Sequence, residues 1–223
     1  MQPLATLVDA TLAELNALLA SNDPERIAVA WTGGKDSTVA LFLWRSLLRG
    51  RGLGRARALN LDTGLKFPEI VAFRDRLAEE WDIDLHIARP EVDLASYPVA
   101  RDKVACCNAL KITPLHKALR NQGISVLITG LRRDENTARA RLAFQEEHLE
   151  PPHLRANPLA AWTEMDVWAF IMERGLPYCS LYDAGYRSLG CRPCTRLDLT
   201  SERSGRDQDK EQRMEELRSL GYF

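Results

Sequence analysis

Short apolar runs alternate along this chain with longer segments in which apolar residues recur at helical spacing. The apolar runs predict about five strands, centred near residues 27, 59, 85, 127 and 157. Segments 37–49, 67–81 and 161–168 show the helical spacing. This alternation predicts an α/β fold, with a parallel sheet and helices on both of its faces. A ligand is then expected at the carboxyl ends of the strands, next to the first strand.

A glycine-containing loop links the first predicted strand directly to the first predicted helix of the sheet. Its residues are Thr32, Gly33, Gly34, Lys35, Asp36 and Ser37. Such a turn points backbone N–H groups and a helix N-terminus at one position, which suits a phosphate. A Walker A loop would need glycine where Val29 stands, and no G-x-G-x-x-G follows. A glycine-rich turn without a ligand is the alternative interpretation.

Further polar residues follow two other predicted strands. Asp62, Thr63 and Gly64 end the second strand, and Gly130 ends the strand near residue 127. Gly130 leads into three arginines, Arg132, Arg133 and Arg139. Guanidinium groups bind phosphate or sulfate with two hydrogen bonds, so these arginines are candidates for an anion clamp. The alternative is a solvated basic turn, paired with the acidic residues at positions 134 and 135.

The loop resembles the S-G-G-x-D-S loop of N-type ATP pyrophosphatases, with Thr32 in place of the first serine. The stretches D-T-G-x-K-F-P-E, T-G-L-R-R-D-x-x-x-x-R and W-T-E-x-D-V-W resemble the family of phosphoadenosine-phosphosulfate reductases and sulfate adenylyltransferase small subunits. This resemblance covers about residues 27–194. It implies a Rossmann-like adenine-nucleotide alpha-hydrolase fold. It also implies that the loop, segment 62–64, Gly130 and the three arginines contact ATP or a sulfonucleotide.

The chain contains five cysteines: Cys106, Cys107, Cys179, Cys191 and Cys194. An adjacent pair followed about eighty residues later by C-x-x-C resembles the iron–sulfur branch of the sulfonucleotide reductases. The resemblance implies a [4Fe–4S] cluster on Cys106, Cys107, Cys191 and Cys194, with Lys111 nearby. Zinc and redox-active thiols are the alternatives. Cys179 matches no ligand position and is expected to be buried.

Two features depart from the reductase pattern. Reductases of that branch carry a nucleophilic cysteine on a C-terminal segment, whereas no cysteine follows Cys194 here. Their loop is usually degraded, whereas this one is intact, and the last residues resemble the tail of the adenylyltransferase small subunit. We therefore expect ATP-dependent adenylyl transfer to sulfate or another oxyanion, with Mg²⁺ and pyrophosphate release. The expected catalytic residues are Lys35, Asp36, Arg132 and Arg133.

Two other functions fit the same residues. One is a [4Fe–4S] reductase of adenylyl sulfate or its 3′-phosphorylated form, with the thiol supplied by a partner. The other is a non-catalytic nucleotide-binding subunit that works with a GTPase-type partner. Pyrophosphate release from Mg-ATP would separate the adenylyltransferase from both.

The 223 residues suggest one domain, 1–198, and a C-terminal tail, 199–223. We expect the tail to be helical over 203–220 and ordered when substrate or a partner binds. Polar segment 146–152 is expected to form a loop over the site. A net charge of −1 gives no general attraction to nucleic acid or membranes. With no segment expected to span a bilayer and no signal peptide expected, the predicted location is cytoplasmic, without structural disulfides.

Overall fold

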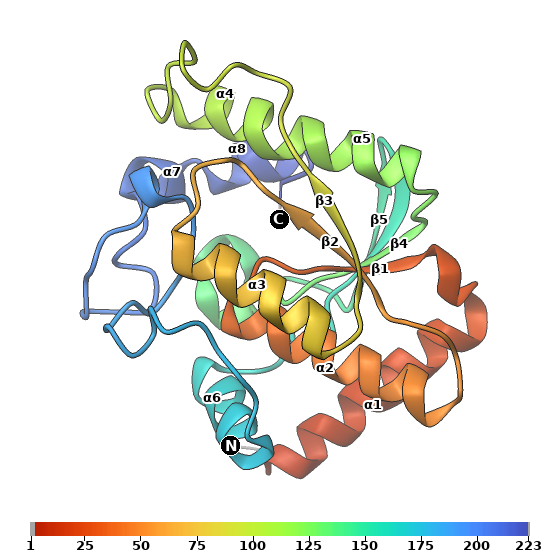
Figure 1. The fold of residues 1–223 in the computed structure, drawn as a ribbon. Coiled ribbons are helices and arrows are strands. Elements are labelled where there is room, and N and C mark those ends of the chain that lie inside the picture. The colour runs from red at the N-terminus through yellow and green to blue at the C-terminus, as the bar shows by residue number, and fades with distance from the viewer. Residues whose placement is uncertain (1–2, 223) are drawn as a thin grey trace.

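The computed structural model describes residues 3–222, and its centre is one six-stranded sheet (Figure 1). The strand order is β3-β2-β1-β4-β6-β5. All neighbouring strands run parallel except β5 and β6, which pair antiparallel as a hairpin at one edge. The strands are β1 (Ile27–Ala30), β2 (Arg57–Leu61), β3 (Asp84–Ala88), β4 (Val126–Ile128), β5 (Gln145–Leu149) and β6 (Pro152–Ala156).

Helices cover both faces of this sheet (Figure 1). One face is covered by α1 (Leu4–Ser21), α2 (Lys35–Gly50), α3 (Pro68–Glu80) and α6 (Glu164–Arg174). On the other face lies a continuous helical segment made of α4 (Lys103–Cys107), a π-helical turn (Asn108–Ile112) and α5 (Thr113–Asn121). Two short helices near the C-terminus, α7 (Gln208–Gln212) and α8 (Met214–Ser219), contact α4.

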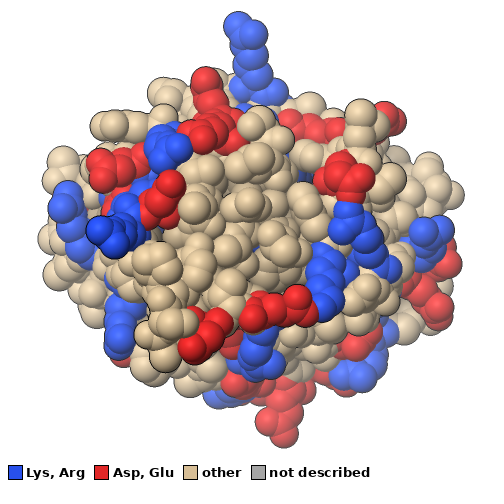
Figure 2. Space-filling view, turned by 90° about the horizontal axis from the view of Figure 1, so that it is seen from above, with Lys and Arg blue, Asp and Glu red and all other residues tan. Residues whose placement is uncertain are grey.

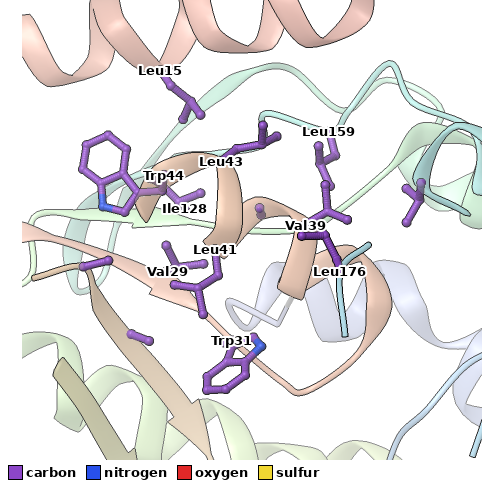
Figure 3. Packing of buried hydrophobic residues seen from close by; sticks show 14 of the residues in the cluster. Leu15, Val29, Trp31, Val39, Leu41, Leu43, Trp44, Ile128, Leu159 and Leu176 are labelled. Atoms are coloured by element: carbon purple, nitrogen blue, oxygen red, sulfur yellow. The ribbon is translucent and has the colours of Figure 1, made fainter. Parts of the chain in front are cut away.

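The strand β1 shows why the sheet needs cover on both faces. Ile27 and Val29 belong to the large cluster under α1, α2, α3 and α6, whereas Ala28 and Ala30 belong to the smaller cluster under α5. Side chains of a strand alternate between its faces, and here both sets are buried. Figure 3 shows the larger cluster, in which Trp31 packs near the end of β1. Burying each large apolar side chain contributes about 1.5–3 kcal/mol.

The expected α/β fold is confirmed, but the sheet differs from the expectation at one edge. Segment 145–149 forms β5 and pairs with β6, so the polar segment 146–152 is not a loop over the site. The alternating exposure of β5, polar side chains included, is that of an edge strand with one side in water. The last predicted strand ends at Ala156, one residue before its expected centre.

We expected no segment long and apolar enough to cross a bilayer, and by these two criteria alone that expectation was wrong. Helix α1 is long and apolar enough to do so, and it lies near the N-terminus. In this fold the helix packs on α2 and α6, and its Thr11 hydroxyl donates a hydrogen bond to the Pro158 carbonyl at 3.1 Å. The same hydroxyl accepts one from Trp162 Nε1 at 3.0 Å. The helix buries Leu7, Val8, Leu15, Leu18 and Leu19 in the main cluster, and 33% of its residues are buried.

The C-terminal segment packs against the domain. Met214 and Leu217 of α8 are buried in a small cluster with Val104 and Cys107 of α4. The helix predicted over 203–220 begins only at Gln208 and is divided into α7 and α8 at Arg213. Figure 2 shows the face of the molecule seen from above: a broad uncharged area is bordered by acidic and basic residues together. This face therefore offers no large patch of one charge to a nucleic acid.

Candidate active site

The loop between β1 and α2 is closed by its own hydroxyl groups. Ser37 Oγ accepts a hydrogen bond from the Thr32 N–H at 3.2 Å and donates one to the Gly34 carbonyl at 3.0 Å. Gly33 has a φ of +83°, and a side chain there would meet Ile70. Glycine is therefore required at this position for both reasons. The loop lies at the carboxyl end of β1, between β2 and β4, where a parallel sheet of this order binds its ligand.

A cavity that is partly open to solvent lies against this loop. Eight of the residues predicted to contact the nucleotide line it: Thr32, Gly34, Lys35, Asp36, Ser37, Thr63, Gly130 and Arg139. The prediction of a ligand site at the strand ends thus agrees with the geometry.

Other predicted residues do not line the cavity. Asp62 accepts a hydrogen bond from the Gly64 N–H at 3.1 Å and one from Arg74 at 3.3 Å. Burial opposes ionisation of Asp62, but these bonds hold the pKa of its carboxyl below the ordinary value. Asp62 therefore stabilises the turn that follows β2. Arg133 donates from Nε to the Leu142 carbonyl at 2.8 Å, away from the other two predicted clamp arginines.

Lys35 and Arg132 are buried in a network of carboxylates. Lys35 Nζ donates to Glu202 at 2.5 Å and to Asp36 at 3.3 Å. Arg132 is fully buried and donates to Asp36 at 2.6 Å, to Glu202 at 2.5 Å and to Asp134. Burial alone would lower the pKa of Lys35, but Asp36 and Glu202 outweigh burial and raise it. Both cations are therefore charged, and both are paired within the chain.

Three carboxylates of this network could together approach a divalent cation. Oxygens of Asp36, Glu135 and Glu202 lie within 4.8 Å of one another. Each already has a cationic partner, since Glu135 accepts from Arg139 at 2.6 Å while Asp36 and Glu202 accept from Lys35. A Mg²⁺ ion would have to replace those cations, so Mg²⁺ binding stays a prediction.

Two arginines that the sequence analysis did not assign also line the cavity. Arg203 donates to both carboxylate oxygens of Glu211 at 2.8 Å. Arg206 is 6% exposed, and its Nε has no hydrogen-bond partner among residues 3–222. Its guanidinium lies against Gly190, where any side chain would collide with it. A buried cation lacking a full set of acceptors favours an anion in the adjoining cavity.

The four predicted ligand cysteines come together in a second, smaller cavity. Cys106 and Cys107 end helix α4, and Cys191 and Cys194 flank a single 3₁₀ turn. All four line this cavity together with apolar residues and Lys111. All are free thiols, and the fifth cysteine, Cys179, is buried in the main core as expected.

The spacing of the sulfur atoms bears on which metal group these cysteines could hold. Zinc bonds to thiolates at about 2.3 Å, so the sulfurs of a tetrahedral zinc site lie about 3.8 Å apart. Among the described residues, no three of these sulfurs lie within 4.8 Å of one another. The donor set is all thiolate, which is the set that holds [2Fe–2S] and [4Fe–4S] clusters. Binding of a cluster by these cysteines stays a prediction.

Positive groups surround these cysteines. Burial raises the pKa of Cys106 and of Cys194, whereas for Cys191 the charge of Lys111 and a hydrogen bond with Thr63 outweigh burial and lower the pKa to about 7. Thr63 Oγ1 lies 3.3 Å from Cys191 Sγ. A cluster of thiolates is anionic, so such compensation is what a cluster site needs.

Cys191 and Lys111 each line both cavities. Lys111 Nζ also donates to the Tyr222 hydroxyl at 3.4 Å, and the buried Lys210 donates to the same hydroxyl at 2.7 Å. The two cavities thus share a wall that carries a thiol and a cation. This shared wall links the predicted nucleotide site to the predicted cluster site.

Comparison with known proteins agrees with this geometry. Residues 26–197 match the family model described as the phosphoadenosine phosphosulfate reductase domain. An adenosine 5′-phosphosulfate reductase of Deinococcus radiodurans is 38% identical over 160 residues, which cover 68% of this chain and 62% of that protein. One from Burkholderia cepacia is 30% identical over 210 residues, covering 88% and 82%.

A solved structure shows the same fold. The phosphoadenylyl-sulfate reductase of Candida auris, in a phosphate complex, aligns with a TM-score of 0.68 at 20% identity, covering 86% of this chain and 96% of that one. The alignment supports the Rossmann-like fold that the resemblance implied. Since the family model matches most of the sequence, this chain belongs to the phosphoadenosine phosphosulfate reductase family.

Proposed function

We propose that this chain binds adenylyl sulfate, or its 3′-phosphorylated form, and serves in the reduction of the sulfate group to sulfite. The observation that carries the proposal is the shared wall of the two cavities, with Cys191 and Lys111 facing both. The relatives are named as reductases, which favours this function over the adenylyl transfer expected from the loop.

The anionic phosphosulfate of such a substrate requires cations in the cavity. Arg139, Arg203, Arg206, Lys66 and Lys111 supply them. Of these, Arg206 has an unsatisfied nitrogen, and Arg203 and Arg139 are paired with glutamates. Guanidinium groups bind phosphate and sulfate oxygens with charge-assisted hydrogen bonds. These residues would bind and orient the substrate, and they would neutralise the charge that develops on the leaving phosphate.

The balanced reaction needs two thiols. A thiolate attacks the sulfur of the sulfo group, the bond from that sulfur to the phosphate oxygen breaks, and the nucleoside phosphate leaves. A second thiolate then attacks the thiol sulfur of the resulting S-sulfonate. This step forms a disulfide and releases sulfite, so the two thiols supply the two electrons.

The first thiol is assigned to a separate donor. Cys179 is 1% exposed within the main core, and the other four cysteines face one another around the smaller cavity. We propose that those four, Cys106, Cys107, Cys191 and Cys194, hold a [4Fe–4S] cluster. When bound, such a cluster would supply a polarisable, redox-active group beside the wall that adjoins the substrate's cavity. A small dithiol or a thioredoxin-like protein would serve as donor.

A second function, adenylyl transfer from Mg-ATP to an oxyanion, is favoured by one observation. The loop keeps Gly33 at φ +83° and the Thr32 and Ser37 hydroxyls in contact with each other, which supports a loop that binds pyrophosphate. Under this function, Lys35 and Asp36 would act on the pyrophosphate and its metal, and a GTPase-type partner would be expected. Both points stay predictions.

The test uses anaerobic protein reconstituted with iron and sulfide. Its iron and acid-labile sulfide are measured first, and zinc in their place would contradict the cluster. Adenylyl sulfate and its 3′-phosphate are then supplied with dithiothreitol or thioredoxin. Sulfite and the nucleoside phosphate, formed in equal amounts, are expected. Pyrophosphate release from Mg-ATP with sulfate, in the absence of sulfite formation, would instead establish adenylyl transfer.

A further inference from the structure

Glu202 lies at the centre of the loop's cationic groups. Its Oε1 accepts hydrogen bonds from Lys35 Nζ and from Arg132 Nη2, each at 2.5 Å. The Glu202 side chain is 11% exposed, and those of its partners are 1% and 0% exposed. A carboxylate from the C-terminal segment therefore occupies a position at the loop that would otherwise suit an anionic ligand.

The bonding of Lys35 leaves no donor for a ligand. An ammonium group has three N–H bonds. Lys35 Nζ directs hydrogen bonds to Glu202, to Asp36 at 3.3 Å and to the Arg187 carbonyl at 3.3 Å. A pyrophosphate oxygen could bind this lysine only by displacing one of these acceptors. It would also stand next to two carboxylates, where like charges repel.

Glu202 is held in place by its neighbours in the chain. The adjacent Arg203 pairs with Glu211 and with Glu135, which accepts at 3.3 Å. The backbone of this segment bonds to the stretch that carries Cys194: the Arg196 N–H donates to the Gly205 carbonyl at 2.8 Å, and the Asp207 N–H donates to the Cys194 carbonyl at 3.2 Å. Glu202 is thus held in place behind Lys35, which lines the cavity.

The cavity near Arg206 differs from the part near Lys35, whose charge is already paired with Glu202. Arg206 takes no part in the bonds of Lys35 and Arg132 described above, and its Nε has no partner among the described residues. One end of the cavity therefore contains a neutralised loop, while Arg206 offers an unsatisfied buried cation. A nucleotide with a compact anion could bind near Arg206 without displacing Glu202, whereas the triphosphate of ATP also needs the loop.

We propose that Glu202 determines specificity: it fills the pyrophosphate position of the loop and so makes the cavity accept sulfonucleotides in preference to ATP. The proposal rests on the proposed function, since it assumes that a sulfonucleotide is the substrate. It accounts for an intact ATP-type loop in a chain whose relatives are named as reductases.

The test measures binding by titration calorimetry with cluster-loaded protein under anaerobic conditions. The probes are inorganic pyrophosphate, ATP and adenylyl sulfate. Glu202→Gln keeps the size of the side chain and removes its charge. We expect at least tenfold tighter binding of pyrophosphate and ATP, and a change below threefold for adenylyl sulfate. Adding Lys35→Met to Glu202→Gln should abolish the gain.

Asp134→Asn is the matched control. Asp134 also pairs with Arg132, yet it forms no bond to Lys35. This variant removes the same charge, so its binding of all three probes should stay within threefold of the unchanged protein. If Glu202→Gln does not fold, which circular dichroism reports, Glu202→Ala takes its place.

Two results would overturn the role of Glu202. One is a gain below threefold for pyrophosphate, and the other is an equal gain for adenylyl sulfate, which would indicate a general charge effect. Failure of the proposed function is distinguished by the unchanged protein, which would then neither bind nor reduce a sulfonucleotide. The pyrophosphate measurement would still decide whether Glu202 blocks the loop.

Discussion

Replacing Gly130 with alanine should disturb the loop between β1 and α2, because the added Cβ would collide with its backbone. Gly130 follows β4 and lies against the first turn of α2. An added Cβ would lie 2.6 Å from the Ser37 nitrogen, 2.7 Å from the Asp36 carbonyl carbon and 2.8 Å from Ser37 Cα. All three atoms belong to the backbone, so no side-chain rotation relieves the contact. Either the end of β4 or the start of α2 has to move.

The size of the effect follows from these distances. Ordinary contact begins at 3.4 Å, so the Ser37 nitrogen has to shift by about 0.8 Å. Overpacking of this kind costs about 1–3 kcal/mol. For a domain of this size that cost lowers Tm by about 2–12 °C. A shift of 0.8 Å also misplaces the N–H groups of the loop, so we expect at least a tenfold loss of nucleotide affinity.

The assay compares Gly130→Ala with Gly54→Ala. A Cβ at Gly54 meets no atom within 4 Å. Thermal unfolding gives the change in Tm, and calorimetry with adenylyl sulfate gives the change in affinity. A Gly130→Ala protein that matches the Gly54→Ala protein in both measurements would refute the claim that backbone contact sets the position of the loop.

Three further predictions follow from other parts of the structure. Burial lowers the pKa of His148 to about 4, so below pH 6.5 its imidazole stays neutral in the native state but gains a proton in the unfolded state. The free energy of unfolding should therefore fall by up to about 3 kcal/mol between pH 6.5 and pH 4. Denaturant titrations of His148→Gln should show a smaller fall. Arg206→Met should weaken adenylyl sulfate binding at least tenfold in calorimetry without lowering Tm, since a buried, incompletely paired cation is removed; a lower Tm with unchanged affinity would contradict this. Cys194→Ser should reduce bound iron in the reconstituted protein while Cys179→Ser does not, and equal losses would argue against the assigned ligands.

The loop between β1 and α2 was predictable because its structure depends on residues that are close in sequence. Strand, glycine turn and helix occupy segment 27–50 without interruption, and the hydroxyl bonds that close the loop span three to five residues. The cap of α6 is equally local, since Thr163 and Asp166 form a capping box across three residues. Features set by neighbours in sequence need no knowledge of the tertiary structure.

The arginine clamp shows where such reasoning fails. Arg132 and Arg133 are adjacent, yet one is fully buried against Asp36 and Glu202 while the other bonds to the Leu142 carbonyl. Sequence reports that guanidinium groups follow the strand, but their direction depends on partners from distant segments. Glu202 is 167 residues from Lys35, and no periodicity connects the two.

Segment 145–149 was missed as a strand for a different reason. Its residues are mostly polar, and polar segments are typical of loops. An edge strand, however, buries one side of its side chains at most, and pairing with β6 satisfies its backbone. His148 lies on that partly covered side, stacked on His153 at 4.8 Å. The sequence of β5 therefore lacks the apolar pattern expected of a strand, because this strand is stabilised by its pairing with β6.

The loop resembles that of ATP-using enzymes, whereas the cysteines resemble those of the reductases. The two features are compatible once the partner of each charge in the loop is considered. A lysine after a glycine turn indicates a phosphate site because a buried cation needs an anion. In this fold the anion is Glu202, which comes from the segment that also carries Arg206 and bonds to the backbone at Cys194. The same loop thus fastens the C-terminal segment over the cavity and brings Arg206 beside the wall that holds Cys191. Under our proposals, an ATP-type loop is retained because its charges position a sulfonucleotide site, and removing one carboxylate should return the loop to binding pyrophosphate.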